Sequence, residues 1–84
     1  MTDWTHVKSD IVRSLLEGRA PADRINLGIA LDVMLNEQDA DITDLDIPED
    51  VFFGRADRMD CAYEALRRNQ FGLALAQIRA FYLI

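Results

Sequence analysis

The sequence has little of what a secreted domain, a linker or an enzyme needs. It contains one cysteine, two prolines and four glycines among 84 residues. A lone cysteine excludes an intrachain disulfide, on which small secreted domains usually depend. The few glycines and prolines are scattered, so they form no linker or low-complexity tract. We therefore expect one domain over residues 1–84.

Long apolar runs and an excess of positive charge are also missing. No run approaches the ~18 apolar residues that a membrane-spanning helix requires. The first four residues, Met1 to Trp4, have neither the basic nor the apolar region of a signal peptide. The formal net charge of −6 disfavours contact with phosphates, which needs a basic face. These absences predict a cytoplasmic protein that binds neither membrane nor nucleic acid directly and whose electrostatic complement is a basic protein.

Residues that carry catalytic chemistry are equally sparse. His6 is the only histidine, and 55 positions separate it from Cys61, the only cysteine. Zinc binding and proton transfer both need partners that neither residue has nearby in the sequence. We expect His6 at a surface or boundary, and Cys61 as a small, partly buried apolar residue. Ser9 and Ser14 fall inside a predicted helix, away from any base. The sequence therefore predicts no enzyme, no metal and no cofactor.

Apolar residues at spacings of three and four predict helices along most of the chain. The first helix is expected over 3–17, capped by Thr2 or Asp3 and ended by Gly18. The second is expected over 21–37, begun by Pro21. Residues 25–35 also alternate with period two, as a strand would. We favour a helix because a lone strand would have no partner, and we expect this nearly all-apolar helix to be central and buried.

The second half of the sequence predicts a polar connection followed by a helical hairpin. Residues 38–47 form a polar connection, and a short helical turn begins at Pro48 and ends at Gly54. A third helix over 55–68 and a fourth from Phe71 onward form the hairpin. The expected fold is an all-α bundle of four main helices with a short extra helical turn near residue 48. The predicted core residues are Trp4, Val7, Ile11, Leu15, Leu27, Leu31, Met34, Leu35, Met59, Tyr63, Leu66, Phe71, Leu75 and Ile78.

The negative charge is concentrated in the middle third of the sequence. Residues 25–54 carry eight acids and no base, whereas the other residues carry seven acids and nine bases. One interpretation is calcium, because Asp39, Asp41 and Thr43 have the alternate spacing that begins an EF-hand loop. However, Asp44 stands where that loop needs glycine, and Asp50 stands where it needs a bidentate glutamate. The other two interpretations are a solvated loop that keeps the domain soluble and a contact surface for a basic partner.

Apolar residues within this acidic run favour the contact surface. Burial of apolar anchors supplies affinity, and the surrounding charge supplies association rate and selectivity. The same apolar residues could instead hold the loop to the core, and the sequence leaves both alternatives open. The predicted partner-binding residues are Glu37, Asp39, Asp41, Asp44, Asp46, Glu49 and Asp50, with Phe52 and Phe53 as anchors.

The C-terminal residues Phe81, Tyr82, Leu83 and Ile84 form a second candidate contact. Four consecutive apolar residues cannot all be buried on one face of a helix. Those that point outward suggest a homodimer or a docking site on a larger chain.

Together these features predict a non-enzymatic inhibitor or antagonist. Its carboxylates would occupy a basic site on a partner protein, such as a site that receives nucleic acid. Toxin-immunity proteins and virus-encoded anti-CRISPR proteins share this profile of size and charge, which is an analogy and not a motif match. The alternative is a structural subunit or adaptor that dimerises or docks through its apolar C-terminal hairpin.

Overall fold

The computed structural model describes residues 3–42 and 47–83. Within those ranges it contains no strand and four helices: α1 (Asp10–Leu16), α2 (Arg24–Ile42), α3 (Glu49–Arg67) and α4 (Phe71–Leu83). The predicted all-α bundle of four main helices is confirmed. Among these helices, none combines the length and the apolar character that a membrane crossing requires.

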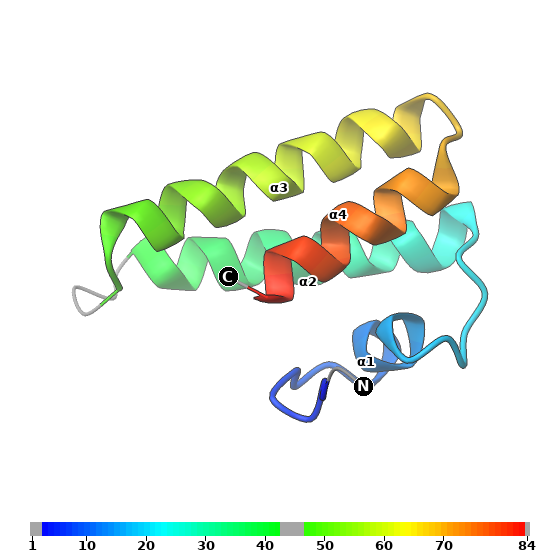
Figure 1. Ribbon diagram of the computed structural model, residues 1–84, viewed down its shortest axis with the longest axis horizontal. Helices are drawn as coiled ribbons and strands as arrows, with labels where there is room; N and C mark the ends of the chain where they lie inside the picture. The colour runs from blue at the N-terminus through cyan, green and yellow to red at the C-terminus, as the bar shows by residue number, and fades with distance from the viewer. Residues whose placement is uncertain (1–2, 43–46, 84) are drawn as a thin grey trace.

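The helices α2 and α4 each contact the three other helices. The helices α3 and α4 form an antiparallel hairpin with the most extensive interface between the described helices (Figure 1). Asn69, in the left-handed region with φ of 59°, makes the turn between α3 and α4, as asparagine often does after the end of a helix. The short helix α1 packs against α2 and α4, on the side of the bundle away from α3.

The first predicted helix is wrong in its N-terminal half. Residues 3–9 are not helical, and α1 begins only after Ser9, whose hydroxyl oxygen accepts a hydrogen bond from the Val12 amide at 3.5 Å. Serine is a favoured N-cap residue, and this cap fixes the start of the helix. Because the helix begins late, its register changes, so Val12 is fully buried and Ile11 only partly. Gly18 follows α1 with φ of 81° and ends it as predicted.

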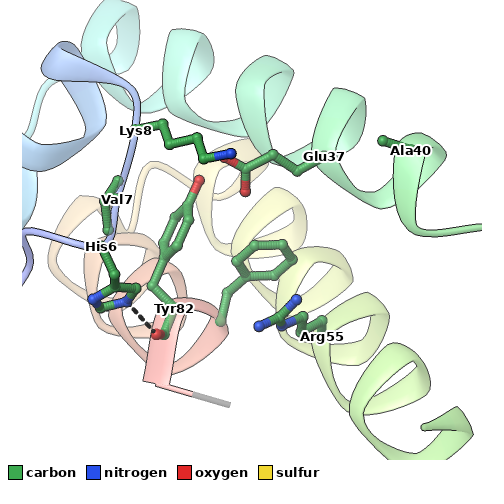
Figure 2. A pocket seen from close by; sticks show the side chains of 8 residues that line it. His6, Val7, Lys8, Glu37, Ala40, Arg55 and Tyr82 are labelled. Atoms are coloured by element: carbon green, nitrogen blue, oxygen red, sulfur yellow. Dashed lines mark hydrogen bonds between the residues drawn. The ribbon is translucent and has the colours of Figure 1, made fainter. Parts of the chain in front are cut away.

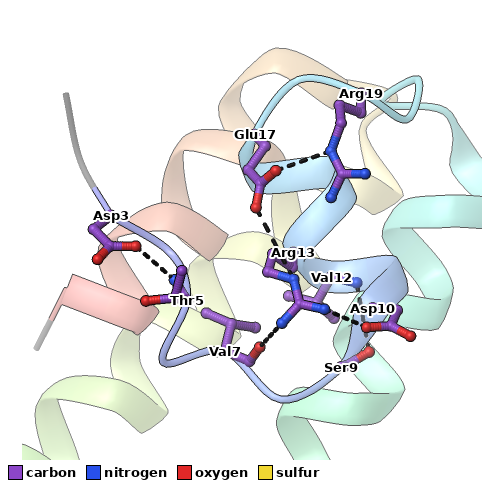
Figure 3. Close-up of polar contacts among 9 residues, drawn as sticks. All are labelled: Asp3, Thr5, Val7, Ser9, Asp10, Val12, Arg13, Glu17 and Arg19. Carbon is purple, nitrogen blue, oxygen red and sulfur yellow. Dashed lines mark hydrogen bonds and ion pairs between the residues drawn. The ribbon is translucent and has the colours of Figure 1, made fainter.

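The segment 3–9 nevertheless belongs to the core. The side chains of Trp4 and Val7 are buried against the helices. Figure 3 shows how a side chain of α1 holds this segment. The Arg13 guanidinium donates a hydrogen bond to the Val7 carbonyl oxygen at 3.1 Å, and it also pairs with Asp10. The apolar spacing of Trp4 and Val7 therefore predicted their burial correctly, but the helix that it also predicted is absent from this segment.

The second predicted element is a helix, and its strand alternative is wrong. The helix α2 begins at Arg24, three positions after Pro21, because the Asp23 carboxylate accepts from the Asn26 amide at 2.8 Å and caps it. It continues to Ile42, so residues 38–42 are helical and not part of a connection. The predicted burial of this helix is only partial, since Ile25 on its outer face is 73% exposed.

The third helix is one continuous element through Gly54. The predicted helical turn near residue 48 is its first turn, and the predicted break at Gly54 does not exist. Glycine inside a helix costs about 1 kcal/mol relative to alanine. Packing of α3 against α2 and α4 offsets a cost of that size. The sequence signal at Gly54 was therefore overridden by tertiary contacts.

The core is smaller in side-chain volume than predicted. Leu35 and Tyr63 are exposed, and four predicted core residues are only partly buried: Ile11, Leu66, Phe71 and Leu75. Alanines occupy the helix interfaces in their place, where small side chains let the axes of two helices approach each other. The buried residues that the sequence analysis missed are Val12, Leu16, Ala30, Ala62, Ala65, Ala74 and Phe81.

Candidate functional site: an acidic helix face and a cleft

The outer face of α3 carries a row of acidic side chains. Positions three or four apart in a helix lie on the same face, and the continuity of α3 through Gly54 extends this face along the helix. We define the acidic stripe as the exposed carboxylates on this face together with one exposed aromatic ring among them. Its members are Glu49, Asp50, Phe53, Asp57 and Asp60.

Phe53 is held in place by contacts with its neighbours. Its side chain is 62% exposed, and its ring packs edge-to-face on that of Phe52 with centroids 5.5 Å apart. The Phe52 carbonyl oxygen accepts a hydrogen bond of 2.9 Å from Nε2 of Gln38, which is 4% exposed. This part-buried contact ties the start of α3 to α2.

Local electrostatics stabilise the negative charge at the N-terminal end of the stripe and offset it just beyond the C-terminal end. Glu49 and Asp50 lie in the first turn of α3, where the helix dipole stabilises negative charge. Glu64 continues the same face but pairs with Arg68 at 3.0 Å and with Arg67 at 3.8 Å. Its charge is therefore offset locally, so the stripe ends at Asp60.

The structure separates the predicted acidic residues of α2. Asp39 is exposed near the C-terminal end of α2, which lies at the same end of the molecule as the start of α3 (Figure 1). Glu37 is half-buried and faces a cleft. Asp41 belongs to α2, but its side chain lies outside the described residues, as do Asp44 and Asp46 entirely.

Sequence reasoning missed Asp57 and Asp60. Their spacing from Asp50 and Phe53 carried the signal, since 50, 53, 57 and 60 alternate steps of three and four. The predicted helix break at Gly54 hid it, because residues in separate helices share no face. The predicted anchor Phe53 is exposed, whereas Phe52 is half-buried.

The second feature is a cleft of about 310 Å³ between the N-terminal segment and three helices. Figure 2 shows its walls, which come from parts of the chain that are distant in sequence. The residues that line it are His6, Val7, Lys8, Glu37, Ala40, Arg55, Phe81 and Tyr82.

Tyr82 connects the walls of this cleft. Nε2 of His6 donates to the Tyr82 carbonyl oxygen at 3.1 Å, because a carbonyl can only accept (Figure 2). Burial, and then the nearby charge of Glu37, raises the pKa of the Tyr82 hydroxyl well above its usual value. The hydroxyl therefore stays protonated and remains a hydrogen-bond donor. Next to it, the Arg55 guanidinium lies 5.9 Å from the centroid of the Phe81 ring, within cation–π range.

Of the other residues singled out from the sequence, Cys61 belongs to neither feature, whereas Phe81 and Tyr82 line the cleft. Cys61 is exposed, so its predicted partial burial is wrong. Of the C-terminal apolar group, Phe81 is buried in the chain's own core, Tyr82 is half-buried and Leu83 is exposed, while Ile84 lies outside the described residues. In the two described ranges, no three His, Cys, Asp or Glu side chains are grouped closely enough to hold a metal ion.

Comparison with known proteins adds no family. No family model, no curated protein and no solved structure matches this chain.

Proposed function

We propose that this chain is a non-enzymatic inhibitor that binds a basic surface of a partner protein through the acidic stripe of α3. The observation that carries the proposal is the continuity of α3 through Gly54. It places the exposed Phe53 ring among four exposed carboxylates on a single rigid face. Apolar burial at a central aromatic side chain and complementary charge around it are the usual sources of affinity and selectivity at a protein interface.

The mean density of negative charge along the stripe suits a surface that receives nucleic acid. Glu49 and Asp60 are about 16 Å apart along the axis at about 1.5 Å per residue. Four negative charges over that length approach the density of a DNA strand, which carries one phosphate per about 3.4 Å. A basic groove that binds a phosphate backbone would therefore find comparable charge on α3.

The first test compares two double variants with the same net charge. Asp57→Asn/Asp60→Asn removes two charges from the stripe, and Asp3→Asn/Asp32→Asn removes two exposed charges elsewhere. Proteins are captured from a nuclease-treated lysate of the source organism at low and high salt. The captured basic protein is then purified, and each variant competes with a DNA duplex for it.

The stripe variant should bind about 3- to 30-fold more weakly than wild type, as expected when two exposed ion pairs are lost. Its binding should also depend less on salt. The control variant should keep wild-type affinity. Equal affinity of the two double variants, or capture that does not respond to salt, contradicts the proposal.

A further inference from the structure

The outer face of α4 is apolar and uncovered. Leu73, Ala76 and Leu83 are exposed, and Ala80 among them is half-buried. Steps of three, four and three residues place these side chains on one face of the helix. In Figure 1, α4 lies in front of α2, and no described segment is drawn over its outer side. We call these four side chains the leucine–alanine face, which shares Leu83 with the predicted C-terminal contact.

The polar side chains of α4 border this face and are bonded within the chain. Arg79 is the only charged residue of α4, and its guanidinium donates to the Leu16 carbonyl oxygen at 3.3 Å. On the opposite border, the side-chain oxygen of Gln77 accepts a hydrogen bond of 3.2 Å from Arg58. The leucine–alanine face between these borders therefore carries no charge.

The distribution of charge favours a second copy of this chain as the occupant of the face. Residues 25–54 carry eight acids and no base, so two copies repel each other wherever these parts of α2 and α3 meet their equivalents. A basic partner, in contrast, finds its electrostatic complement on those acidic surfaces and not on an uncharged face. The leucine–alanine face is where two copies bury apolar surface with the least repulsion.

The order of the side chains on this face also suits a second copy. Leucine, alanine, alanine and leucine, at steps of three, four and three, read the same in both directions along α4. A two-fold axis that crosses the helix midway between Ala76 and Ala80 brings these two alanines of opposite copies together. The same axis brings Leu73 against Leu83 of the second copy. A two-fold dimer requires such a self-complementary patch, and small central side chains let the two helix axes approach.

We propose that the chain forms a homodimer in which the leucine–alanine faces of two antiparallel α4 helices pack together. Leu73 and Leu83 are about 15 Å apart along the axis at about 1.5 Å per residue, which is short for a standard interface of about 800 Å² per partner. The dimer is therefore weak, with a dissociation constant of roughly 10–500 µM. The contacts of α3 with α4 come from Arg55 and Arg58 and not from the acidic stripe. The dimer leaves the stripe open, so this proposal is independent of the proposed function.

The experiment is sedimentation equilibrium of the full chain from about 10 µM to about 1 mM, at an ionic strength that screens repulsion between acidic copies. Leu73→Glu/Leu83→Glu places like charges together across the two-fold axis. Leu73→Lys/Leu83→Glu places opposite charges together there, but only in the antiparallel arrangement. The control, Ile25→Glu/Ile29→Glu, makes the first change on two exposed isoleucines of α2.

The wild-type chain should pass from monomer to dimer over this range. The Leu73→Glu/Leu83→Glu variant should associate at least about tenfold more weakly, and the Leu73→Lys/Leu83→Glu variant at least about threefold more strongly than that. The α2 control should stay within about threefold of the wild type. Circular dichroism at 222 nm checks that each variant is folded, as the exposure of all four substituted side chains predicts.

A second measurement needs no substitution. In an equal mixture of ¹³C-labelled and unlabelled wild-type chain, isotope-filtered NMR should detect contacts between the methyl groups of Leu73 in one copy and Leu83 in the other. Four results overturn the proposal. They are a monomer at about 1 mM, loss of association in the α2 control, equal association of the two Leu73/Leu83 variants, and contacts between copies that lie outside α4.

Discussion

Replacement of Phe81 by alanine should destabilise the fold far more than replacement of Leu83, two positions later in α4. Phe81 is 2% exposed and Leu83 is 62% exposed. A buried phenylalanine removes roughly 150–250 Å² from water, worth about 4–6 kcal/mol at about 25 cal/mol per Å². Since alanine keeps part of this burial, we expect a loss of about 3–5 kcal/mol. Leu83→Ala should change stability by less than about 0.5 kcal/mol.

The assay is urea unfolding followed by circular dichroism at 222 nm. An 84-residue domain at roughly 0.05–0.15 kcal/mol per residue is stable by about 4–13 kcal/mol. Phe81→Ala is therefore close to the limit of folding, so Phe81→Leu, with an expected loss of about 1–2 kcal/mol, provides a measurable second variant. If Phe81→Leu and Leu83→Ala have the same unfolding midpoint as wild type, the packing of α4 described above is wrong.

Two further predictions concern Gln38 and Tyr82. Gln38→Ala should lower the free energy of unfolding by about 1–3 kcal/mol, because it removes the part-buried hydrogen bond from Gln38 to the Phe52 carbonyl. The control is Asn36→Ala, an exposed change on the same helix, and equal urea midpoints for the two variants would contradict the role of Gln38. The raised pKa of Tyr82 predicts that stability falls as pH rises above the unfolded value of 10.0, since the unfolded chain releases the proton and the folded chain retains it. The free energy of unfolding, measured from pH 8 upward, should fall by at most about 1.4 kcal/mol per pH unit, and by less because the ring is partly hydrated. An equally steep fall in the Tyr82→Phe variant would refute the assignment to Tyr82.

The local signals in the sequence determined most of the fold. Helical spacing of apolar residues predicted four helices, and Gly18 and Asn69 ended the first and third helices as glycine and asparagine often do. The errors fall where a local signal competed with tertiary packing. Trp4 and Val7 are apolar and buried, but the Ser9 cap and the contact from Arg13 hold them in a non-helical segment. At Gly54 the helix continued because its packing outweighed a cost of about 1 kcal/mol.

The candidate sites depended more strongly on the tertiary structure. The sequence by itself determined that the chain is acidic, helical and poor in catalytic residues. Only the tertiary structure decided that Asp57 and Asp60 share a face with Phe53, since that required α3 to be unbroken. Only the tertiary structure brought His6 and Lys8 to Tyr82, more than 70 positions away. Helix periodicity is a local property that propensity and capping encode, whereas contacts between distant segments depend on how the whole core packs.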